Sequence, residues 1–359
     1  MRVGILGGGQ LARMLALAGH PLGLHTTVLD PAQAPCGAAV ADHVQSAYDD
    51  PEGLAHLAAA SDVVTYEFEQ VPEQAVAGLA ERVAVQPRGE ALGVGRDRLD
   101  EKSLFQELGI PTAPFQPVDS EQALTAAVEA VGLPAVLKTR TMGYDGKGQE
   151  ILRQPADAEG AWDRLGGVPL ILEAMVAFRR EVSMIAVRGG DGDCRFYPVV
   201  ENVHREGILH ESFARAEDPV QAAAEGHARR LLERLDYVGV LALELFDAGD
   251  QLLANEMAPR VHNSGHWTIE GAETSQFENH MRAVCGLPLG NTEPVGQCVM
   301  INLIGELPDT AAVLAAPGAH LHLYDKAPRP GRKIGHITLR AADPEALKQR
   351  MQGLSEALG

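Results

Sequence analysis

Four short apolar runs alternate with Ala- and Leu-rich helical stretches over the first 90 residues, and this alternation strongly constrains the fold. The runs are RVGIL, TTVLD, DVVTYEF and RVAVQ. Parallel strands need a crossover connection, usually a helix, so the pattern is typical of β-α-β units around a parallel sheet. We therefore expect an α/β fold that begins with a doubly wound, Rossmann-like domain over residues 1–95.

A glycine loop follows the first run, in GILGGGQLARML at residues 4–15. Gly7, Gly9 and Ala12 have the spacing G-x-G-x-x-A, in which a tight turn brings a helix N-terminus close to an anion. Asp30 ends the second run, about where a dinucleotide site has its ribose partner. Taken alone, this stretch indicates an NAD-dependent oxidoreductase.

Length and composition exclude several classes of protein. A chain of 359 residues is too long for one compact core, so two or three domains are expected. The 30 Lys and Arg residues against 49 Asp and Glu give a net charge of −19, which repels nucleic acid. The four cysteines are far apart and lack a C-x-x-C spacing, so we expect neither a zinc site nor disulfides. Because no run reaches the ~18 apolar residues of a membrane helix and no signal peptide is visible, we expect a cytoplasmic protein without a membrane partner.

The rest of the chain indicates a mixed α+β organisation. Expected helices cover residues 96–108, 121–131 and 218–235, and expected strands include PAVLKTR, PLILEAMV and REVSMIAVRG. The tail from about residue 294 is rich in strands, so it predicts a small β-rich domain at this end.

The stretch VLALELFDAGDQLLANEM predicts a hairpin with its turn around Asp250. Symmetric pairing about that residue places Glu244 opposite Glu256, with their Cβ atoms ~5 Å apart. Like charges so placed destabilise a sheet unless a cation lies between them, and Mg²⁺ takes one or two protein carboxylates beside phosphate oxygens. Asn255 could add an oxygen ligand. A bulge that shifts the register would instead leave a solvated hairpin, and the spacing alone does not decide.

A second glycine loop lies in LKTRTMGYDGKGQEIL. Gly143, Gly146 and Gly148 allow backbone N–H groups to approach an anion, and Lys138 and Lys147 supply positive charge that suits phosphate. The loop does not fit the Walker pattern, which needs G-K-[ST] at the start of a helix. A simple hairpin turn is the alternative, but together with the carboxylate pair the loop favours a nucleoside triphosphate site.

Several motifs, in this order along the chain, resemble the ATP-grasp superfamily and, within it, the 5-(carboxyamino)imidazole ribonucleotide synthases of bacterial purine (IMP) biosynthesis. They are LKTRTMGYDGKGQ, ILEAMV with FRREVS, ALELF, LLANEMAPRVHNSGHWTIEG and YDKAPRPGRKIGH. The resemblance implies an N-terminal domain over 1–95, an ATP-grasp region over 96–290 with a mobile lid at about 115–185, and a small C-terminal domain over 291–359. It also implies a homodimer.

The activity that the resemblance implies is that of an ATP-dependent carbon–nitrogen ligase. It joins 5-aminoimidazole ribonucleotide to bicarbonate, with carboxyphosphate as the intermediate and ADP and phosphate as products. Mg²⁺, with Mn²⁺ as a substitute, would be the cofactor, and ATP the co-substrate.

The resemblance further implies which residues form the site. ATP would be bound by Arg98, Lys138, Gly143, Tyr144, Asp145, Gly146, Lys147, Gly148, Gln149, Glu173, Ala174, Met175, Val176, Glu181, His204, Asn255 and Glu256. The other substrates would be bound by Gln10, Leu11, Glu67, Tyr144, Asp145, Arg260, His262, Asn263, Ser264, Lys326 and Arg332. The metal would be held by Glu244 and Glu256, and the catalytic residues would be Arg260, His262 and Lys138.

Two of these residues have roles that follow from their chemistry. The guanidinium of Arg260 is a planar, permanently charged group suited to carboxyphosphate. His262 could move the amine proton because its ordinary pKa is near neutrality, but a structural imidazole is an equal alternative.

The basic turn and the first glycine loop would both contact the acceptor substrate. KAPRPGRK gathers basic residues in an acidic chain, so we expect Lys326 and Arg332 to bind the ribonucleotide phosphate, with a solvated turn as the alternative. The first glycine loop would lie beside the same substrate, with Gln10 and Leu11 in contact and Glu67 at the ribose. The dinucleotide fingerprint would then reflect the fold and not the cofactor.

Three alternatives to this function stay open at this point. They are the NAD-dependent oxidoreductase, a formate-dependent glycinamide ribonucleotide transformylase with the same ATP site, and a catalytically silent binding protein. One departure from the family pattern is Met142, where a small residue or glycine is expected.

Overall fold

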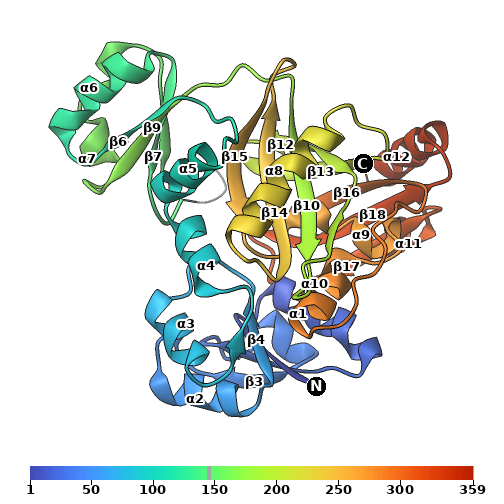
Figure 1. The fold of residues 1–359 in the computed structure, drawn as a ribbon. Coiled ribbons are helices and arrows are strands. Elements are labelled where there is room, and N and C mark those ends of the chain that lie inside the picture. Colours follow the sequence, from blue (N-terminus) through green and yellow to red (C-terminus); the bar gives the residue numbers. More distant parts are fainter. Residues whose placement is uncertain (144–146, 359) are drawn as a thin grey trace.

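The N-terminal part of the chain forms a parallel sheet with the strand order β3-β2-β1-β4-β5. In this computed structural model, which describes residues 1–143 and 147–358, the sheet lies at the bottom of Figure 1. The order runs from β1 to β3 in one direction and restarts beside β1 with β4, so the expected doubly wound arrangement is confirmed. The elements are β1 (Arg2–Leu6), α1 (Gln10–Gly19), β2 (His25–Asp30), β3 (Asp42–Gln45), α2 (Pro51–Ala59), β4 (Val63–Tyr66), α3 (Glu73–Ala80), β5 (Ala84–Val85) and α4 (Gly89–Arg96).

A second, antiparallel sheet with the order β6-β9-β7-β8 projects from the rest of the molecule at the upper left of Figure 1. Its helix α6 (Glu121–Val131) has the expected bounds, because Ser120 caps its start and Gly132 ends it with a φ of 83°. The sheet ends at Ala174, and the next strand belongs to another sheet, so the lid that we propose ends before residue 185. The other elements are β6 (Phe115–Val118), β7 (Ala135–Thr139), β8 (Gln149–Leu152), α7 (Ala161–Arg164) and β9 (Leu170–Ala174).

The largest sheet has the order β15-β14-β10-β12-β13-β16-β18-β17, with β11 paired to β10. Strand β16 pairs with β13, so the C-terminal strands continue the central sheet. The strands are β10 (Arg180–Arg188), β11 (Cys194–Phe196), β12 (Val199–Arg205), β13 (Ile208–Arg215), β14 (Gly239–Asp247), β15 (Leu252–Ala258), β16 (Gln297–Ile304), β17 (Ala319–Leu323) and β18 (Lys333–Ala341). The helices are α5 (Arg98–Glu107), α8 (Gln221–Arg234), α9 (Thr268–Gly271), α10 (Gln276–Val284), α11 (Thr310–Ala315) and α12 (Pro344–Leu358).

The N-terminal sheet and the central sheet share one hydrophobic cluster. Leu11 and Leu15 of α1 are buried in this cluster together with Phe277 and Met281 of α10, and the two helices contact each other. This packing places the first glycine loop beside the central sheet. The four cysteines are free, as expected. Among the described helices, none combines the length and apolar character needed to span a bilayer.

His280 of α10 joins the two parts through both ring nitrogens. Its Nδ1 accepts a hydrogen bond from the Val240 N–H (3.1 Å), and its Nε2 lies 2.9 Å from the Thr65 hydroxyl of β4. Because Nδ1 is an acceptor, the neutral ring carries its proton on Nε2 and donates it to Thr65. The ring is fully buried, and burial lowers the pKa of His280 to about 4.

The low pKa of His280 predicts that acid lowers the stability of the folded chain. In the unfolded chain the imidazole has a pKa of about 6.5, so the folded state binds fewer protons and its stability falls as the pH drops below that value. We expect a loss of about 2 kcal/mol between pH 7 and pH 5 that His280→Gln removes. Urea denaturation of both proteins at the two pH values checks this. Equal losses in the wild type and the variant would contradict it.

Candidate active site

The β14–β15 hairpin brings Glu244 and Glu256 directly opposite each other. The pairs nearest the turn, such as Leu245 with Ala254, follow one register, and a bulge at Asn255 then shifts the register by one residue. The expected carboxylate pair is therefore confirmed, although the bulge produces it and does not disrupt it. The Oδ1 atom of Asn255 is buried and has no hydrogen-bond partner among the described residues.

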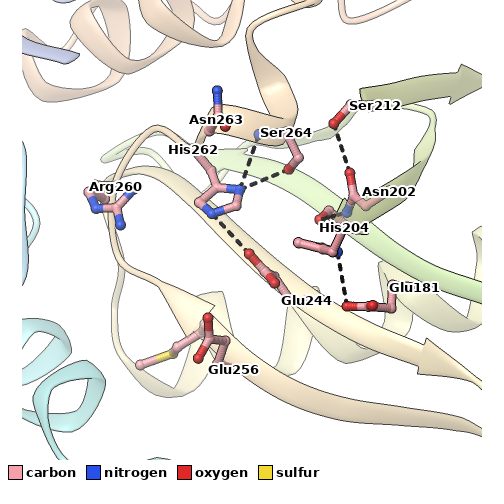
Figure 2. A network of polar contacts seen from close by, with 12 residues as sticks. Glu181, Asn202, His204, Ser212, Glu244, Glu256, Arg260, His262, Asn263 and Ser264 are labelled. Carbon is pink, nitrogen blue, oxygen red and sulfur yellow. Dashed lines mark hydrogen bonds and ion pairs between the residues drawn. The ribbon is translucent and has the colours of Figure 1, made fainter. Parts of the chain in front are cut away.

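Each of the two carboxylates has its own side-chain partner. Glu256 accepts a hydrogen bond from Arg98 Nη1 at 2.8 Å. Glu244 Oε1 lies 2.9 Å from His262 Nε2 (Figure 2). Burial favours the protonated form of Glu244, but His262 and His204 outweigh it, so the pKa of Glu244 stays below its ordinary value. Both residues thus present carboxylates on one face of the sheet.

A buried ionic cluster lies beside this pair. Glu173 on β9 is placed between two lysines, with Lys138 Nζ 3.2 Å from Oε1 and Lys102 Nζ 3.1 Å from Oε2. Burial opposes ionisation of Glu173, yet the two lysines hold its pKa at about 2. The neighbouring Glu101 accepts a hydrogen bond from the Met257 N–H (2.6 Å), and burial together with the nearby Glu256 raises the pKa of Glu101 to about 8.

The sequence analysis missed Lys102 and Glu101. Both lie in α5, where their charges suggest an exposed helix face, but the two residues are only 1% and 3% exposed. The signal that could have found Lys102 is its position four residues after Arg98, which puts both cations on one helix face.

The lid loop is described in part. Gly143 accepts a hydrogen bond from Arg98 Nη2 through its carbonyl (3.3 Å), so one arginine contacts both the loop and Glu256. Met142 has a φ of 66°, a conformation that favours glycine. This backbone conformation explains why a glycine is expected at this position. The proposed ligands Tyr144, Asp145 and Gly146 lie outside the described residues.

Glu181 and His204 extend the site across the central sheet. Glu181 Oε2 lies 3.2 Å from His204 Nδ1 (Figure 2). Burial would lower the pKa of His204, but Glu181 and Glu244 raise it. Behind this pair, Asn202 donates a hydrogen bond to Ser183 (2.7 Å) and accepts one from Ser212 (2.9 Å), which fixes the strand that carries His204.

The loop after β15 contributes a third group, which includes the short turn Asn263–Gly265. His262 Nδ1 lies 2.8 Å from the Ser264 hydroxyl, so both ring nitrogens are engaged. Gln276, which the sequence analysis missed, accepts from the His262 N–H (3.0 Å) and donates to its carbonyl (2.6 Å). Asn302 of β16 exchanges hydrogen bonds with Asn263 at 3.0 and 2.6 Å. The loop is therefore held from two sides.

Arg260 binds Glu69 in a close ion pair. Its Nη2 lies 2.6 Å from Glu69 Oε1, and its Nη1 donates to the Val261 carbonyl (3.0 Å). Its Nε is buried without a hydrogen-bond partner among the described residues. The Nε–H of the guanidinium is thus a buried donor next to the site that these two contacts do not use.

The first glycine loop already holds a carboxylate of the chain itself. The N–H groups of Gly9 and Ala12 both donate to Glu67, the latter at 2.8 Å. The Gly8 N–H donates to Asp30 (2.9 Å), which also accepts a hydrogen bond from the Tyr48 hydroxyl (2.8 Å). The groups that a dinucleotide would use are therefore occupied. Glu67 supports the loop, and its contact with a ribose stays a prediction.

Gly7 allows Glu67 to approach the first glycine loop closely, so we expect its substitution to destabilise the chain. Its φ is 104°, and a Cβ atom there would lie 2.5 Å from Glu67 Cγ. Gly23 also has a positive φ, 72°, but a Cβ there would meet nothing within 4 Å. We expect Gly7→Ala to lower the free energy of unfolding by about 2 kcal/mol more than Gly23→Ala. Thermal or urea denaturation measures the difference, and equal losses would show that Glu67 moves aside freely.

The basic turn of the C-terminal part of the chain contacts this loop. Lys326 Nζ donates a hydrogen bond to Gln10 Oε1. Burial lowers the pKa of Lys326. Arg332 Nη1 donates to the Ala327 carbonyl (3.2 Å) and stabilises the basic turn. Leu11 is buried in the shared core, so only its backbone could contact a substrate.

Family models match the chain in three successive segments. They are the ribonucleotide synthetase preATP-grasp domain over residues 1–96, the ATP-grasp domain over 103–277 and the phosphoribosylaminoimidazole carboxylase C-terminal domain over 298–350. The N5-carboxyaminoimidazole ribonucleotide synthase of Pseudomonas aeruginosa is 57% identical over 351 residues, which cover 98% of each chain. The chain belongs to the N5-carboxyaminoimidazole ribonucleotide synthase family.

Solved structures of this family have the same fold. The synthetase of Thermus thermophilus matches with a TM-score of 0.95 and 54% identity, over 99% of this chain and 98% of that one. The synthase of Aspergillus clavatus in complex with ADP and 5-aminoimidazole ribonucleotide matches with a TM-score of 0.91 and 32% identity, over 99% and 98%. The chain is therefore an ATP-grasp ligase, and the NAD-dependent oxidoreductase suggested by the glycine loop is wrong.

Proposed function

We propose that this chain carboxylates 5-aminoimidazole ribonucleotide with bicarbonate and ATP, and yields 5-(carboxyamino)imidazole ribonucleotide, ADP and phosphate in purine biosynthesis. The observation that carries the proposal is the Glu244–Glu256 pair. It lies between a cationic cluster suited to nucleotide phosphates and a rigid loop that carries Arg260 and His262. The Aspergillus clavatus complex, with ADP and the ribonucleotide together, supports the same pairing of ligands.

The donor set of the pair fits Mg²⁺. Among the described residues no three His, Cys, Asp or Glu side chains gather as a metal site. Mg²⁺ needs only one or two carboxylates when phosphates and water complete its shell, and the unpaired Asn255 oxygen suits a hard cation. Glu244, Glu256 and Asn255 would hold it, where it would neutralise phosphate charge.

The chemistry divides into two steps. A bicarbonate oxygen attacks the γ-phosphorus, the bond to the bridging oxygen breaks, and ADP leaves. The exocyclic amine of the ribonucleotide then forms a bond to the carboxyl carbon of carboxyphosphate, while phosphate leaves and the amine loses a proton. Lys138 and Arg98 orient the phosphates, and Arg260 stabilises the anionic intermediate. His262 orients Glu244, because a role as proton carrier requires it to release one of its two partners.

The ribonucleotide phosphate is assigned to Lys326 and Arg332. Lys326 already contacts Gln10 of the first glycine loop, so the substrate would lie between the N-terminal sheet and the basic turn. A homodimer and a cytoplasmic location complete the proposal. Light scattering of the purified protein tests the first, and fractionation of the source cells tests the second.

The decisive experiment is ADP release by the purified protein with ATP and Mg²⁺. 5-Aminoimidazole ribonucleotide and labelled bicarbonate are added separately and then together. We expect release to require the ribonucleotide, and label to appear in an acid-labile product. Activity with formate and glycinamide ribonucleotide instead would favour the transformylase, and no stimulation by any acceptor would contradict the proposal.

A further inference from the structure

Lys102 is the buried charge next to the nucleotide site that the proposed function leaves without a role. Its side chain lies inside the molecule on α5, 1% exposed, and faces away from solvent toward β9 and β15. Its Nζ contacts Glu173 Oε2 at 3.1 Å and the Ala254 carbonyl at 3.2 Å. Ala254 directly precedes Asn255 in β15, so one ammonium group joins the lid sheet to the strand that carries the carboxylate pair.

We propose that Lys102 is a positioning residue that neutralises Glu173 and so leaves the positive charge of Lys138 for the nucleotide phosphates. The proposal rests on the proposed nucleotide site. Without Lys102, Lys138 and Glu173 would form a closed pair with no net charge. With it, two positive charges meet one negative charge, and the cluster keeps one positive charge.

A purely structural role explains this arrangement poorly. A buried ion pair gains little over an apolar contact, and an uncompensated buried charge costs stability. An excess cation under the site is therefore unfavourable in the empty protein and becomes favourable when an anion arrives. Glu173 stays ionised, because the lysines hold its pKa at about 2, and its protonation would only increase the excess. Nor does Glu256 remove it, because Arg98 is its partner at 2.8 Å.

The test compares a charged ligand with an uncharged one. Calorimetric titration with ADP and with adenosine, in the absence of bicarbonate and ribonucleotide, separates phosphate binding from adenine binding. We expect Lys102→Met to weaken ADP binding about tenfold and adenosine binding less than about twofold. Lys348→Met, which removes an exposed lysine of α12, is the matched control and should change neither.

A second variant tests the charge count directly. Lys102→Met combined with Glu173→Gln removes both ion pairs but restores the single positive charge of Lys138. We expect the ratio of ADP to adenosine affinity to return to within about threefold of the wild type. Lys102→Arg, which keeps the charge, should also preserve this ratio. These variants remain informative if Lys102→Met proves unstable.

The opposite results would overturn the inference. If ADP and adenosine binding fall alike, or if the double variant has as low a ratio as Lys102→Met, Lys102 only supports the shape of the pocket. A wild-type chain that binds neither ligand would overturn the proposed nucleotide site as well. Failure of the carboxylation assay with the ADP results as expected would instead contradict the proposed acceptor and leave this inference standing.

Discussion

Replacing Glu256 by glutamine should lower the rate of ADP formation about a thousandfold while the chain remains folded. The change removes one carboxylate of the pair at the Asn255 bulge but almost no volume. Glutamine offers a neutral oxygen, so phosphate charge would be less well neutralised in the transition state. Arg98 would also lose its ion-pair partner at 2.8 Å, so its guanidinium would be held less firmly beside the nucleotide phosphates.

The measurement is steady-state ADP release over a range of Mg²⁺ concentrations. Glu90→Gln is the matched control, since Glu90 pairs with Arg234 at 2.9 Å on the exposed surface. An exposed pair contributes about 0–1 kcal/mol, so this control should retain activity. Unchanged ADP release in Glu256→Gln, or an equal loss in the control, would show that the metal lies elsewhere.

The hairpin shows how far sequence reasoning reaches within one motif. Symmetry about Asp250 predicted that Glu244 faces Glu256, and the structure confirms this pairing. The route differs, because the pairs nearest the turn are offset and Asn255 corrects the offset as a bulge. Periodicity in a sequence identifies strands but does not show where a bulge adds an unpaired residue to one of two paired strands.

Several contacts that support the site were beyond the sequence analysis. Glu67 binds the first glycine loop, Gln276 clamps His262, and Lys102 supports Glu173. In each case a side chain that looks like a surface group is buried by another part of the chain. Residue types and spacing carry no signal for such pairs, whose partners are 14 residues apart for Gln276 and His262 and 55 residues apart for Glu67 and Ala12.

Strand β3 and the point where the lid sheet ends could not be identified from the sequence, for related reasons. The stretch DHVQ is polar and partly exposed at the sheet edge, so no apolar run marks it. The lid expected at about 115–185 included the start of REVSMIAVRG, whose composition identifies a strand but not the sheet to which it belongs. Sheet membership depends on pairing, and β10 pairs with β12 and β14 of the central sheet.

The contact between Arg260 and Glu69 supports a second large prediction. Glu69 follows β4 of the N-terminal domain, so the ion pair at 2.6 Å ties that domain to the loop after β15. Two donors of the guanidinium are used, and its buried Nε is not, among the described residues. We expect Arg260→Met to lower carboxylation several hundredfold, because loss of one preorganised donor to a developing anion costs about 10²–10³ in rate.

Glu69→Gln separates this role from a purely structural one. It breaks the same ion pair but leaves the guanidinium in place, so carboxylation should stay within about threefold of the wild type. Both variants lose the link between the domains, and their thermal stabilities should fall by similar amounts. Arg260→Lys should recover little activity, since an ammonium group lacks the planar set of donors. If Glu69→Gln lost as much activity as Arg260→Met, the ion pair itself would be what the reaction needs, and Arg260 would position the domains without contacting the intermediate.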